Sequence, residues 1–216
     1  ENKLGSIEVG KNEADSLVKE ALKYEKIFED NGFNKIVFSL KSSNPLVTYE
    51  AYTKFSAVSN YPLHIGVTES GFDEVGIIRS ISSLSPLLIN GIGNTIRISL
   101  TKNPLKEIET CKRLLHDLNL YPDYPTIISC PTCGRCLVNK TKEIAEKTLD
   151  YCVKNKKYIK VAIMGCAVNG IGEGKNSDIG LAGSNNEYVV FKDGKIINRI
   201  KEKDALKALF AEIDKF

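Results

Sequence analysis

From residue 13 to about residue 129, amphipathic segments alternate with short apolar runs. The segment 13–31 is typical of a helix, because its apolar side chains recur at helical spacing on one face. Asn44-Pro45 and Asn103-Pro104 each place a capping side chain before a proline, which is a common way to begin a helix. The pattern predicts helices over residues 13–31, 44–56, 73–88 and 103–118. It predicts strands over residues 35–40, 62–67, 95–99 and 125–129.

Strands and helices that alternate at this spacing are typical of parallel βαβ units. Four such units make either half of an eight-stranded barrel or a small open sheet. In both folds, groups that bind a ligand lie at the carboxyl ends of the strands. The predicted strands end in polar residues there: Lys41, Thr68, Glu69, Arg97 and Ser99.

The remainder of the chain has a different pattern. It predicts a helix over residues 142–154, a strand over 158–164, a glycine-rich loop over 165–174 and a closing helix over 203–216. Asp193-Gly194 is a turn signal between two β-type segments, 187–191 and 195–199, and indicates a hairpin. We therefore expect an α+β second domain, with the boundary between Tyr121 and Tyr124. The predicted domains are residues 1–122 and 123–216.

The net charge and the length of the apolar stretches argue against some classes of partner. The formal net charge is +3, and no long basic block occurs. Such a balance does not indicate nucleic acid or an anionic membrane as a partner. No apolar stretch is long enough to cross a bilayer.

The cysteines carry more information than these averages. Three of the six occur in Cys130-Pro-Thr-Cys133-Gly-Arg-Cys136, a spacing that brings thiolates onto one tight loop. We expect a reducing compartment, because this clustering in a long chain does not suggest a disulfide scaffold. Cys166 follows a predicted strand, as Cys130 does, and could complete a metal site. Cys111 and Cys152 occupy helical positions and are predicted to be core residues.

Three interpretations of the clustered thiols stay open at this point. Structural zinc favours two paired Cys-x-x-Cys motifs, whereas Cys166 has no neighbouring cysteine. An iron–sulfur cluster accepts clustered cysteines together with a distant ligand, and the pattern favours it over zinc. Buried, reduced cysteines without a metal are the third interpretation. Glu173 could be an exchangeable iron ligand beside the glycine-rich loop, or simply a solvated residue.

Several long motifs, in one order, resemble 4-hydroxy-3-methylbut-2-enyl-diphosphate synthase, the iron–sulfur enzyme of the non-mevalonate isoprenoid pathway. The similarity extends from about Asn12 to the C-terminus. The motifs that carry it are His64-Ile-Gly-Val-Thr-Glu69-Ser-Gly71, Gly91-Ile-Gly-Asn-Thr-Ile-Arg97-Ile-Ser99, Ile128-Ser-Cys130-Pro-Thr-Cys133-Gly-Arg135, Met164-Gly-Cys166-Ala-Val-Asn169-Gly-Ile171-Gly-Glu173 and Asp178-Ile-Gly-Leu-Ala-Gly183.

The resemblance implies the latter half of a (βα)₈ TIM-type barrel, with four βα units, followed by an α+β cluster domain. It implies a [4Fe–4S] cluster held by Cys130, Cys133 and Cys166, with Glu173 as a fourth ligand that can leave its iron. The implied reaction is the reductive ring opening and dehydroxylation of 2-C-methyl-D-erythritol 2,4-cyclodiphosphate to 4-hydroxy-3-methylbut-2-enyl diphosphate. Ferredoxin or flavodoxin would supply two electrons to a head-to-tail homodimer in the bacterial cytoplasm or the plastid stroma.

The resemblance also assigns roles to individual positions. Lys41, Arg97, Ser99 and Asn169 match positions that hold the substrate, and Glu69 matches a carboxylate near the reacting centre. His64, inside a predicted strand, is interpreted as structural.

The sequence also departs from the family pattern. The match begins partway into the barrel, so the first half is missing, and Ile171 and Cys136 stand where proline and threonine are common. The alternatives are a zinc-binding structural or interaction module, and an inactive partial enzyme that needs the missing half.

Overall fold

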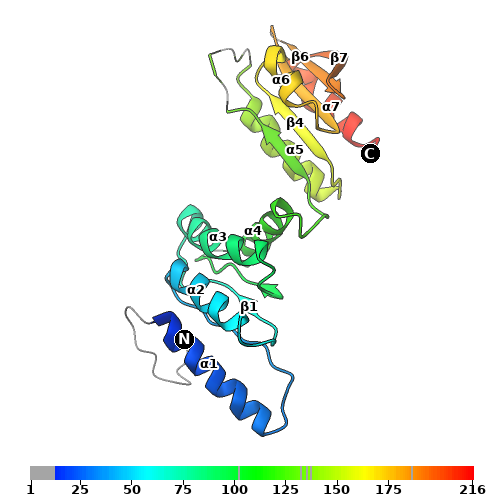
Figure 1. The fold of residues 1–216 in the computed structure, drawn as a ribbon. Coiled ribbons are helices and arrows are strands. Elements are labelled where there is room, and N and C mark those ends of the chain that lie inside the picture. The colour runs from blue at the N-terminus through cyan, green and yellow to red at the C-terminus, as the bar shows by residue number, and fades with distance from the viewer. Residues whose placement is uncertain (1–12, 102, 132, 135, 137, 186) are drawn as a thin grey trace. The chain divides into compact units, whose positions relative to one another are not determined.

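The computed structural model describes residues 13–216 apart from 102, 132, 135, 137 and 186. The chain divides into two compact units, with the division between Tyr121 and Pro122 (Figure 1). We describe each unit by itself and call them the first and the second unit.

Four helices of the first unit confirm the predicted ones to within two residues at each end. They are α1 (Glu13–Asp30), α2 (Pro45–Ser56), α3 (Asp73–Ile89) and α4 (Pro104–Asp117). The caps form as expected: the Asn44 side chain accepts a hydrogen bond from the Leu46 amide, and the Asn103 side chain accepts one from the Leu105 amide. In Figure 1, α2 lies between α1 and α3.

The predicted strands of the first unit are shorter than expected. They are β1 (His64–Ile65) and β2 (Thr95–Ile96), which pair in parallel. The predicted strand 35–40 contributes a single parallel bridge between Phe38 and Leu63. The hydrogen-bonded ladders between these segments are at most two residues long, so most of each predicted strand is not assigned as a strand. The segments nevertheless pair in parallel, as predicted.

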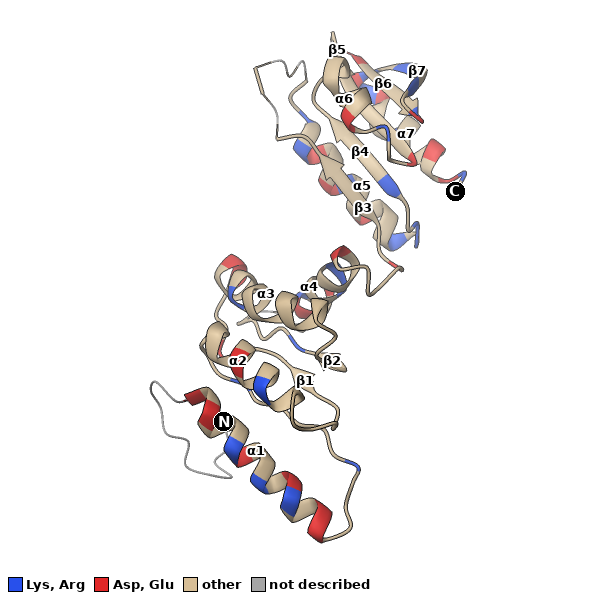
Figure 2. Ribbon diagram, in the orientation of Figure 1, with Lys and Arg blue, Asp and Glu red and all other residues tan. Residues whose placement is uncertain are grey.

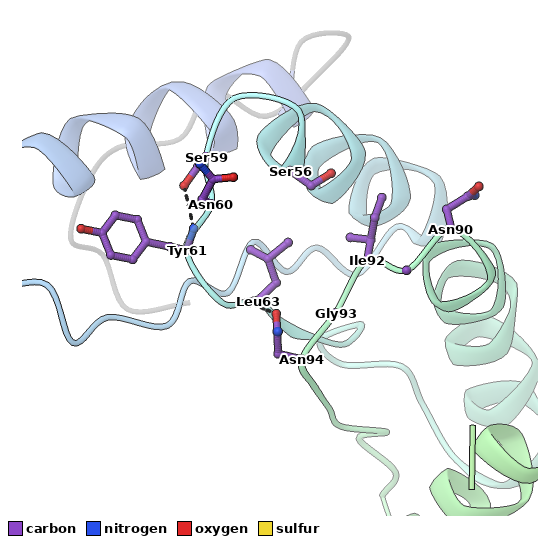
Figure 3. Close-up of a pocket in the computed structure, with 10 residues that line it drawn as sticks. Ser56, Ser59, Asn60, Tyr61, Leu63, Asn90, Ile92, Gly93 and Asn94 are labelled. Carbon is purple, nitrogen blue, oxygen red and sulfur yellow. Dashed lines mark hydrogen bonds between the residues drawn. The ribbon is translucent and has the colours of Figure 1, made fainter. Parts of the chain in front are cut away.

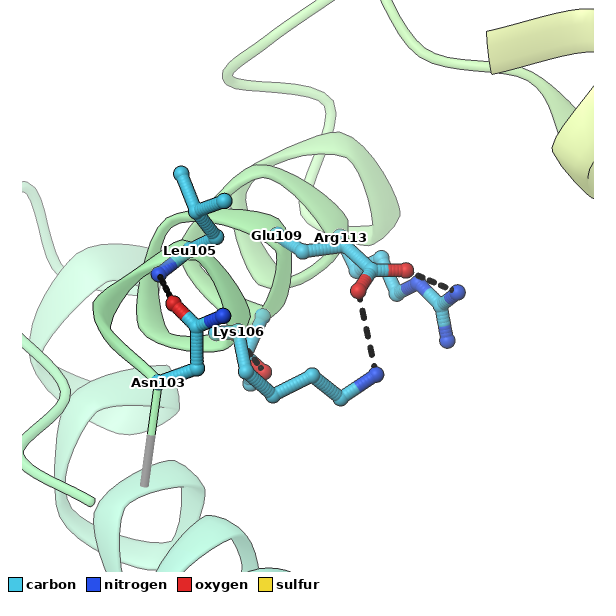
Figure 4. Close-up of polar contacts among 6 residues, drawn as sticks. Asn103, Leu105, Lys106, Glu109 and Arg113 are labelled. Atoms are coloured by element: carbon cyan, nitrogen blue, oxygen red, sulfur yellow. Dashed lines mark hydrogen bonds and ion pairs between the residues drawn. The ribbon is translucent and has the colours of Figure 1, made fainter. Parts of the chain in front are cut away.

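The core of the first unit lies between these segments and the helices. Phe38, Ile65 and Ile98 are among its buried residues, and Phe55 of α2 packs against Phe38 with ring centroids 5.0 Å apart. The opposite face of α1 is solvated, and Figure 2 shows charges of both signs along it. On α4, Glu109 joins Lys106 and Arg113 in a surface ion-pair network (Figure 4). Such pairs contribute little to stability, so the apolar face holds these helices in place.

The second unit contains a five-stranded sheet in the order β3-β4-β5-β6-β7. Its strands are β3 (Thr126–Ser129), β4 (Lys160–Met164), β5 (Ile179–Ser184), β6 (Glu187–Lys192) and β7 (Lys195–Lys201). β3, β4 and β5 are mutually parallel, and β5, β6 and β7 are antiparallel. The segment 125–129, predicted as the fourth strand of the first series, pairs with β4 instead. It belongs to the second unit, because its hydrogen-bonding partner lies there.

Helices cover both faces of this sheet. α5 (Thr141–Lys154) and α7 (Ala205–Ile213), which follows the short 3₁₀ turn Glu202–Asp204, enclose one core with residues such as Ile163 and Leu181. α6 (Ala167–Glu173) packs over β4 and β5, where a smaller core gathers around Met164 and Phe191. Because side chains alternate along β4 and β5, successive residues of each strand pack into different cores on the two faces of the sheet.

One prediction for this unit was wrong, and one strand had no prediction. The glycine-rich segment 165–174, predicted as a loop, contains the helix α6, and no prediction was made from the sequence for β5. The glycines explain both differences. A Cβ on Gly170 would lie 2.5 Å from the Met164 Cβ, and one on Gly180 would lie 2.0 Å from the Phe191 ring. These glycines permit close packing on a sheet rather than a turn.

Within the part of the chain that the structure describes, none of the helices combines the length and the apolar character needed to cross a membrane.

Candidate functional site

One face of the short sheet in the first unit is polar. Side chains alternate along each segment, so that Leu40, Ile65 and Ile98 enter the core while their neighbours face away from it. Those neighbours are Ser39, Lys41, His64, Thr95, Arg97 and Ser99. The face therefore gathers three of the substrate-binding residues predicted from the sequence.

Lys41 and Arg97 are the two cations of this face. A Cβ on Gly66, which lies between them, would be 3.5 Å from the Lys41 Nζ and 2.7 Å from the Arg97 carbonyl oxygen. Burial, and then the charge of Arg97, lower the pKa of Lys41 from its ordinary value. Among the described residues Lys41 has no ion pair, whereas Arg97 Nε lies 3.8 Å from Glu107 Oε2. An anion bound here would relieve the repulsion between the two cations.

His64 also lies on this face. Its Nδ1 lies 2.8 Å from the Thr95 hydroxyl, so it also links β1 to β2. Burial lowers the pKa of His64, and the charges of Lys41 and Arg97 lower it further. The signal for this position was its period-two spacing from Gly66 and Thr68 along the strand.

Glu69 lies on an exposed loop at the carboxyl end of β1. Its backbone has φ of +49°, a conformation that residues other than glycine seldom adopt. The loop around it is tied to its neighbours: the Ser70 hydroxyl donates to the Ser99 carbonyl, and the Thr68 amide donates to the Ser42 carbonyl 3.1 Å away. The structure describes no hydrogen bond or ion pair between Glu69 and Lys41 or Arg97. The loop is thus held beside the polar face with its carboxylate in solvent.

A pocket of about 410 Å³ lies at the other edge of the same sheet. Figure 3 shows its lining, which includes Tyr61 and Leu63 before β1 and Asn90 and Asn94 before β2. The Asn94 side chain accepts a hydrogen bond of 2.9 Å from the Leu63 amide. In parallel βα folds, ligand groups lie at the carboxyl ends of the strands, whereas this pocket lies at their amino ends. We therefore do not assign the pocket a role in binding the ligand.

In the second unit, Cys130 and Cys166 follow two neighbouring strands, at the carboxyl end of the sheet. Cys130 directly follows β3, and its amide donates to the Ile163 carbonyl of β4 at 3.1 Å. Cys166 comes two residues after the end of β4, is buried and stands immediately before α6. The parallel pairing of β3 with β4 thus brings together two cysteines that are 36 positions apart in the sequence.

The other two candidate sulfurs differ in their environments. Cys133 is exposed on the loop after Cys130, whereas Cys136 is half-buried. A Cβ on Gly165 would lie 2.7 Å from the Cys136 sulfur and 3.6 Å from the Cys130 sulfur. A larger residue than glycine here would displace the Cys136 sulfur, whereas the Cys130 sulfur would be in ordinary van der Waals contact with it.

Asn169 and Glu173 lie on α6, four residues apart and therefore on one face of the helix. Both are exposed. Glu173 ends the helix, so about 10 Å of helical rise separates it from Cys166 at the other end. The structure does not bring Glu173 to the cysteine edge.

Among the residues that the structure describes, no three His, Cys, Asp or Glu side chains gather as a ready ligand group for a metal ion. The donor chemistry nevertheless fits an iron–sulfur cluster, because cysteine sulfur is the usual ligand of such clusters and Cys130 and Cys166 follow neighbouring parallel strands at the same end of the sheet. The prediction of Cys130, Cys133, Cys166 and Glu173 as the ligand set stays a prediction.

The remaining two cysteines behave as the sequence predicted. Cys152 is buried in the core beneath α5, and burial raises the pKa of its thiol to about 11. Cys111 packs against the core of the first unit, and burial raises its pKa as well. Both thiols stay protonated at neutral pH and have the character of small apolar side chains.

Comparison with curated proteins gives relatives of one kind. The chain is 48% identical over 202 residues to 4-hydroxy-3-methylbut-2-en-1-yl diphosphate synthase (flavodoxin) of Malacoplasma penetrans, which covers 92% of this chain and 55% of that protein. It is 47% identical to the protein of the same name in Clostridium tetani, over 93% of this chain and 57% of the relative. For the Bacillus subtilis protein of that name, the identity is 43%, over 93% of this chain and 53% of the relative.

The chain thus spans about half the length of the curated relatives that it matches. Family comparisons divide it as the fold does. Residues 2–112 match the GcpE TIM-barrel domain, and residues 126–215 match the GcpE protein C-terminal domain. These two matches cover most of the chain, and the chain therefore belongs to the GcpE family.

Proposed function

We propose that this chain takes part in the reductive ring opening and dehydroxylation of 2-C-methyl-D-erythritol 2,4-cyclodiphosphate to 4-hydroxy-3-methylbut-2-enyl diphosphate. The observation that carries the proposal is the polar face of the first unit. It sets Lys41 and Arg97 side by side at the expected edge of a parallel fold, in a chain 43–48% identical to synthases.

In this proposal the first unit is the latter half of a (βα)₈ barrel. Its successive segments bridge in parallel, from Phe38 to Leu63 and from β1 to β2. Their apolar side chains face the helices, as the outer layer of a barrel requires. The predicted count of four βα units included the segment that pairs as β3 in the second unit. The proposed half-barrel therefore keeps three strand segments and four helices.

The residues of the first unit would bind and orient the diphosphate. Lys41 and Arg97 provide charge, and Ser99 adds a hydroxyl at the same edge. Charge-assisted hydrogen bonds to phosphate oxygens offset the desolvation that lowers the pKa of Lys41. Glu69 is the proposed proton-handling group, since its loop is held beside this face with the carboxylate accessible.

In the second unit, Cys130, Cys133 and Cys166 would hold a [4Fe–4S] cluster, with Glu173 as an exchangeable ligand and Asn169 as a substrate contact. When bound, such a cluster supplies low-potential electrons and a Lewis-acidic iron for the departing hydroxyl. The support is the shared edge of Cys130 and Cys166 beside Gly165.

The proposed electron donor is a flavodoxin, which the names of the relatives specify, with a ferredoxin as the alternative. The proposed assembly is a head-to-tail homodimer in the bacterial cytoplasm, or in the plastid stroma of a eukaryote.

The test is anaerobic reconstitution with iron and sulfide, followed by calorimetric titration with the cyclic diphosphate and turnover with reduced flavodoxin. We expect about four irons per chain, micromolar or tighter binding, and formation of the linear diphosphate in the presence of the missing N-terminal half supplied as a separate fragment. Stoichiometric zinc without iron would instead identify a structural zinc module. Failure of the reconstituted pair of fragments to bind the cyclic diphosphate would overturn the proposal.

A further inference from the structure

The polar face of the first unit has a second row of side chains next to its two cations. His64 pairs with Thr95 in the parallel ladder, and Gly66 and Arg97 each follow two residues later, on the same face. Lys41 reaches over this second position, because its Nζ lies 3.5 Å from the place of a Cβ on Gly66. The imidazole of His64 therefore lies in the row that adjoins both cations.

Local contacts fix His64 from two sides. Its carbonyl oxygen accepts hydrogen bonds from the Tyr52 hydroxyl at 2.7 Å and from the Ser39 hydroxyl at 3.0 Å. Tyr52 is fully buried, and burial raises its pKa to about 12, so its hydroxyl keeps its proton. The ring is held through Nδ1, which lies 2.8 Å from the Thr95 hydroxyl.

The second ring nitrogen of His64 is left for a ligand. Among the residues that the structure describes, none forms a hydrogen bond with Nε2, and the side chain is only half-buried. When both ring nitrogens carry a proton, both donate. A protonated His64 could thus keep its contact with Thr95 and donate from Nε2 at the same time.

The charges around His64 favour its neutral form while no anion is bound. Burial, and then the positive charges of Lys41 and Arg97, lower the pKa of the imidazole, and Tyr52 is uncharged. Glu107 pairs with Arg97, whose Nε lies 3.8 Å from its Oε2. A dianion bound at the two cations would reverse the sign of the local charge and so favour the protonated imidazole.

We propose that His64 is a further binding residue for the cyclic diphosphate: its imidazole takes up a proton from solvent as the dianion binds, and it donates from Nε2 to a phosphate oxygen. The proposal rests on the proposed function, since it presupposes that the diphosphate binds at Lys41 and Arg97. No bond of the substrate forms or breaks in this step. By reciprocity, the chain binds the diphosphate more tightly as the pH falls through the range in which His64 titrates.

The chemistry of the ligand makes this coupling measurable. Each phosphorus of the cyclic diphosphate carries one ester bond and the bridging oxygen, so each has a single, strongly acidic hydroxyl group. The ligand therefore stays a dianion between pH 5.5 and 8, and a change of affinity within this range reports groups of the protein.

The first experiment needs no mutation. The full chain, together with the N-terminal half as a separate fragment, is titrated calorimetrically with the cyclic diphosphate in buffers that differ in their enthalpy of ionisation. We expect uptake of about half a proton per bound ligand at pH 6.5. The affinity should be about tenfold higher at pH 6 than at pH 8.

The second experiment compares His64→Asn with His116→Gln. An asparagine amide lies close to the position of Nδ1, so His64→Asn keeps a partner for Thr95 and removes Nε2 together with the titration. We expect this variant to bind without proton uptake and with an affinity that does not change between pH 6 and 8. His116, the other histidine, is on α4 with Nδ1 3.1 Å from the Tyr121 carbonyl oxygen, and His116→Gln should behave as the parent does.

The outcomes separate this inference from the proposed function. If the parent pair of fragments does not bind the cyclic diphosphate, both are overturned. If the parent binds it without proton uptake, this inference alone is overturned. The same holds if proton uptake persists in His64→Asn, because a merely structural histidine would leave it unchanged.

Discussion

The two units use their sheets in opposite ways. In the second unit, helices cover both faces of a five-stranded sheet, and two cores fill the space between them. In the first unit, helices cover one face of a minimal parallel sheet, while the other face presents Lys41, His64 and Arg97. A parallel sheet is normally covered on both faces. The uncovered polar face is therefore the proposed ligand-binding surface of the first unit, whereas the candidate cysteines of the second unit lie at the carboxyl ends of its strands.

The largest effect is expected from the core of the first unit. Phe55 is fully buried against Phe38, so Phe55→Ala should lower the free energy of unfolding by about 3–5 kcal/mol. Hydrogen exchange would measure it: amides of α2 should lose protection, while those of β4 and β5 keep it, because each core forms within its own unit. Equal loss of protection in both units would show that the two cores unfold together.

The next effect concerns close packing in the second unit. A Cβ on Gly180 would overlap the buried Phe191 ring, so Gly180→Ala should destabilise the sheet by about 1–3 kcal/mol in urea unfolding. Gly172→Ala is the matched control. No atom lies within 4 Å of its Cβ position, and alanine there should stabilise α6 by about 0.5–1 kcal/mol. If Gly180→Ala were as stable as the control, close packing would not be the reason for this glycine.

Lys41→Met tests whether the polar face serves binding rather than folding. It should weaken binding of the cyclic diphosphate about 10- to 100-fold, the value of a charge-assisted hydrogen bond. The pKa of Lys41 is lowered, so its charged form disfavours the folded state below that pKa. The variant should therefore unfold at a higher temperature than the parent at pH 7, and this difference should shrink as the pH rises towards 10.5. Unchanged affinity in calorimetry would remove Lys41 from the site.

The smallest effect is a pH dependence of the first unit. The pKa of His64 is lowered from its ordinary value of 6.5, so the unfolded chain takes up the proton first as the pH falls. The stability of the first unit should be complete above pH 6.5 and should decline below it. His64→Gln should flatten this decline, as monitored by urea unfolding between pH 5 and 7.5. A decline that persists in the variant would assign it to other groups.

Local signals in the sequence were sufficient for much of the fold. Asn44-Pro45 and Asn103-Pro104 began helices as predicted, and Asp193-Gly194 closed the predicted hairpin between β6 and β7. Lys41, Arg97 and Ser99 were selected as polar residues at the carboxyl ends of predicted strands, and they share one face. These features depend on neighbours in the chain, so the sequence carries their signal directly.

The sequence by itself determined the alternation of helices and strand segments, the helix caps, the core positions of Cys111 and Cys152 and the resemblance to one family. Only the tertiary structure decided that the segment around Ile128 joins the second sheet, that Gly170 and Gly180 serve packing in a helix and a strand, and that the Cys130 and Cys136 sulfurs both lie near Gly165. The physical reason is that strand partners and close contacts join residues far apart in the chain, and a local pattern of residue types does not encode which distant neighbour each one meets.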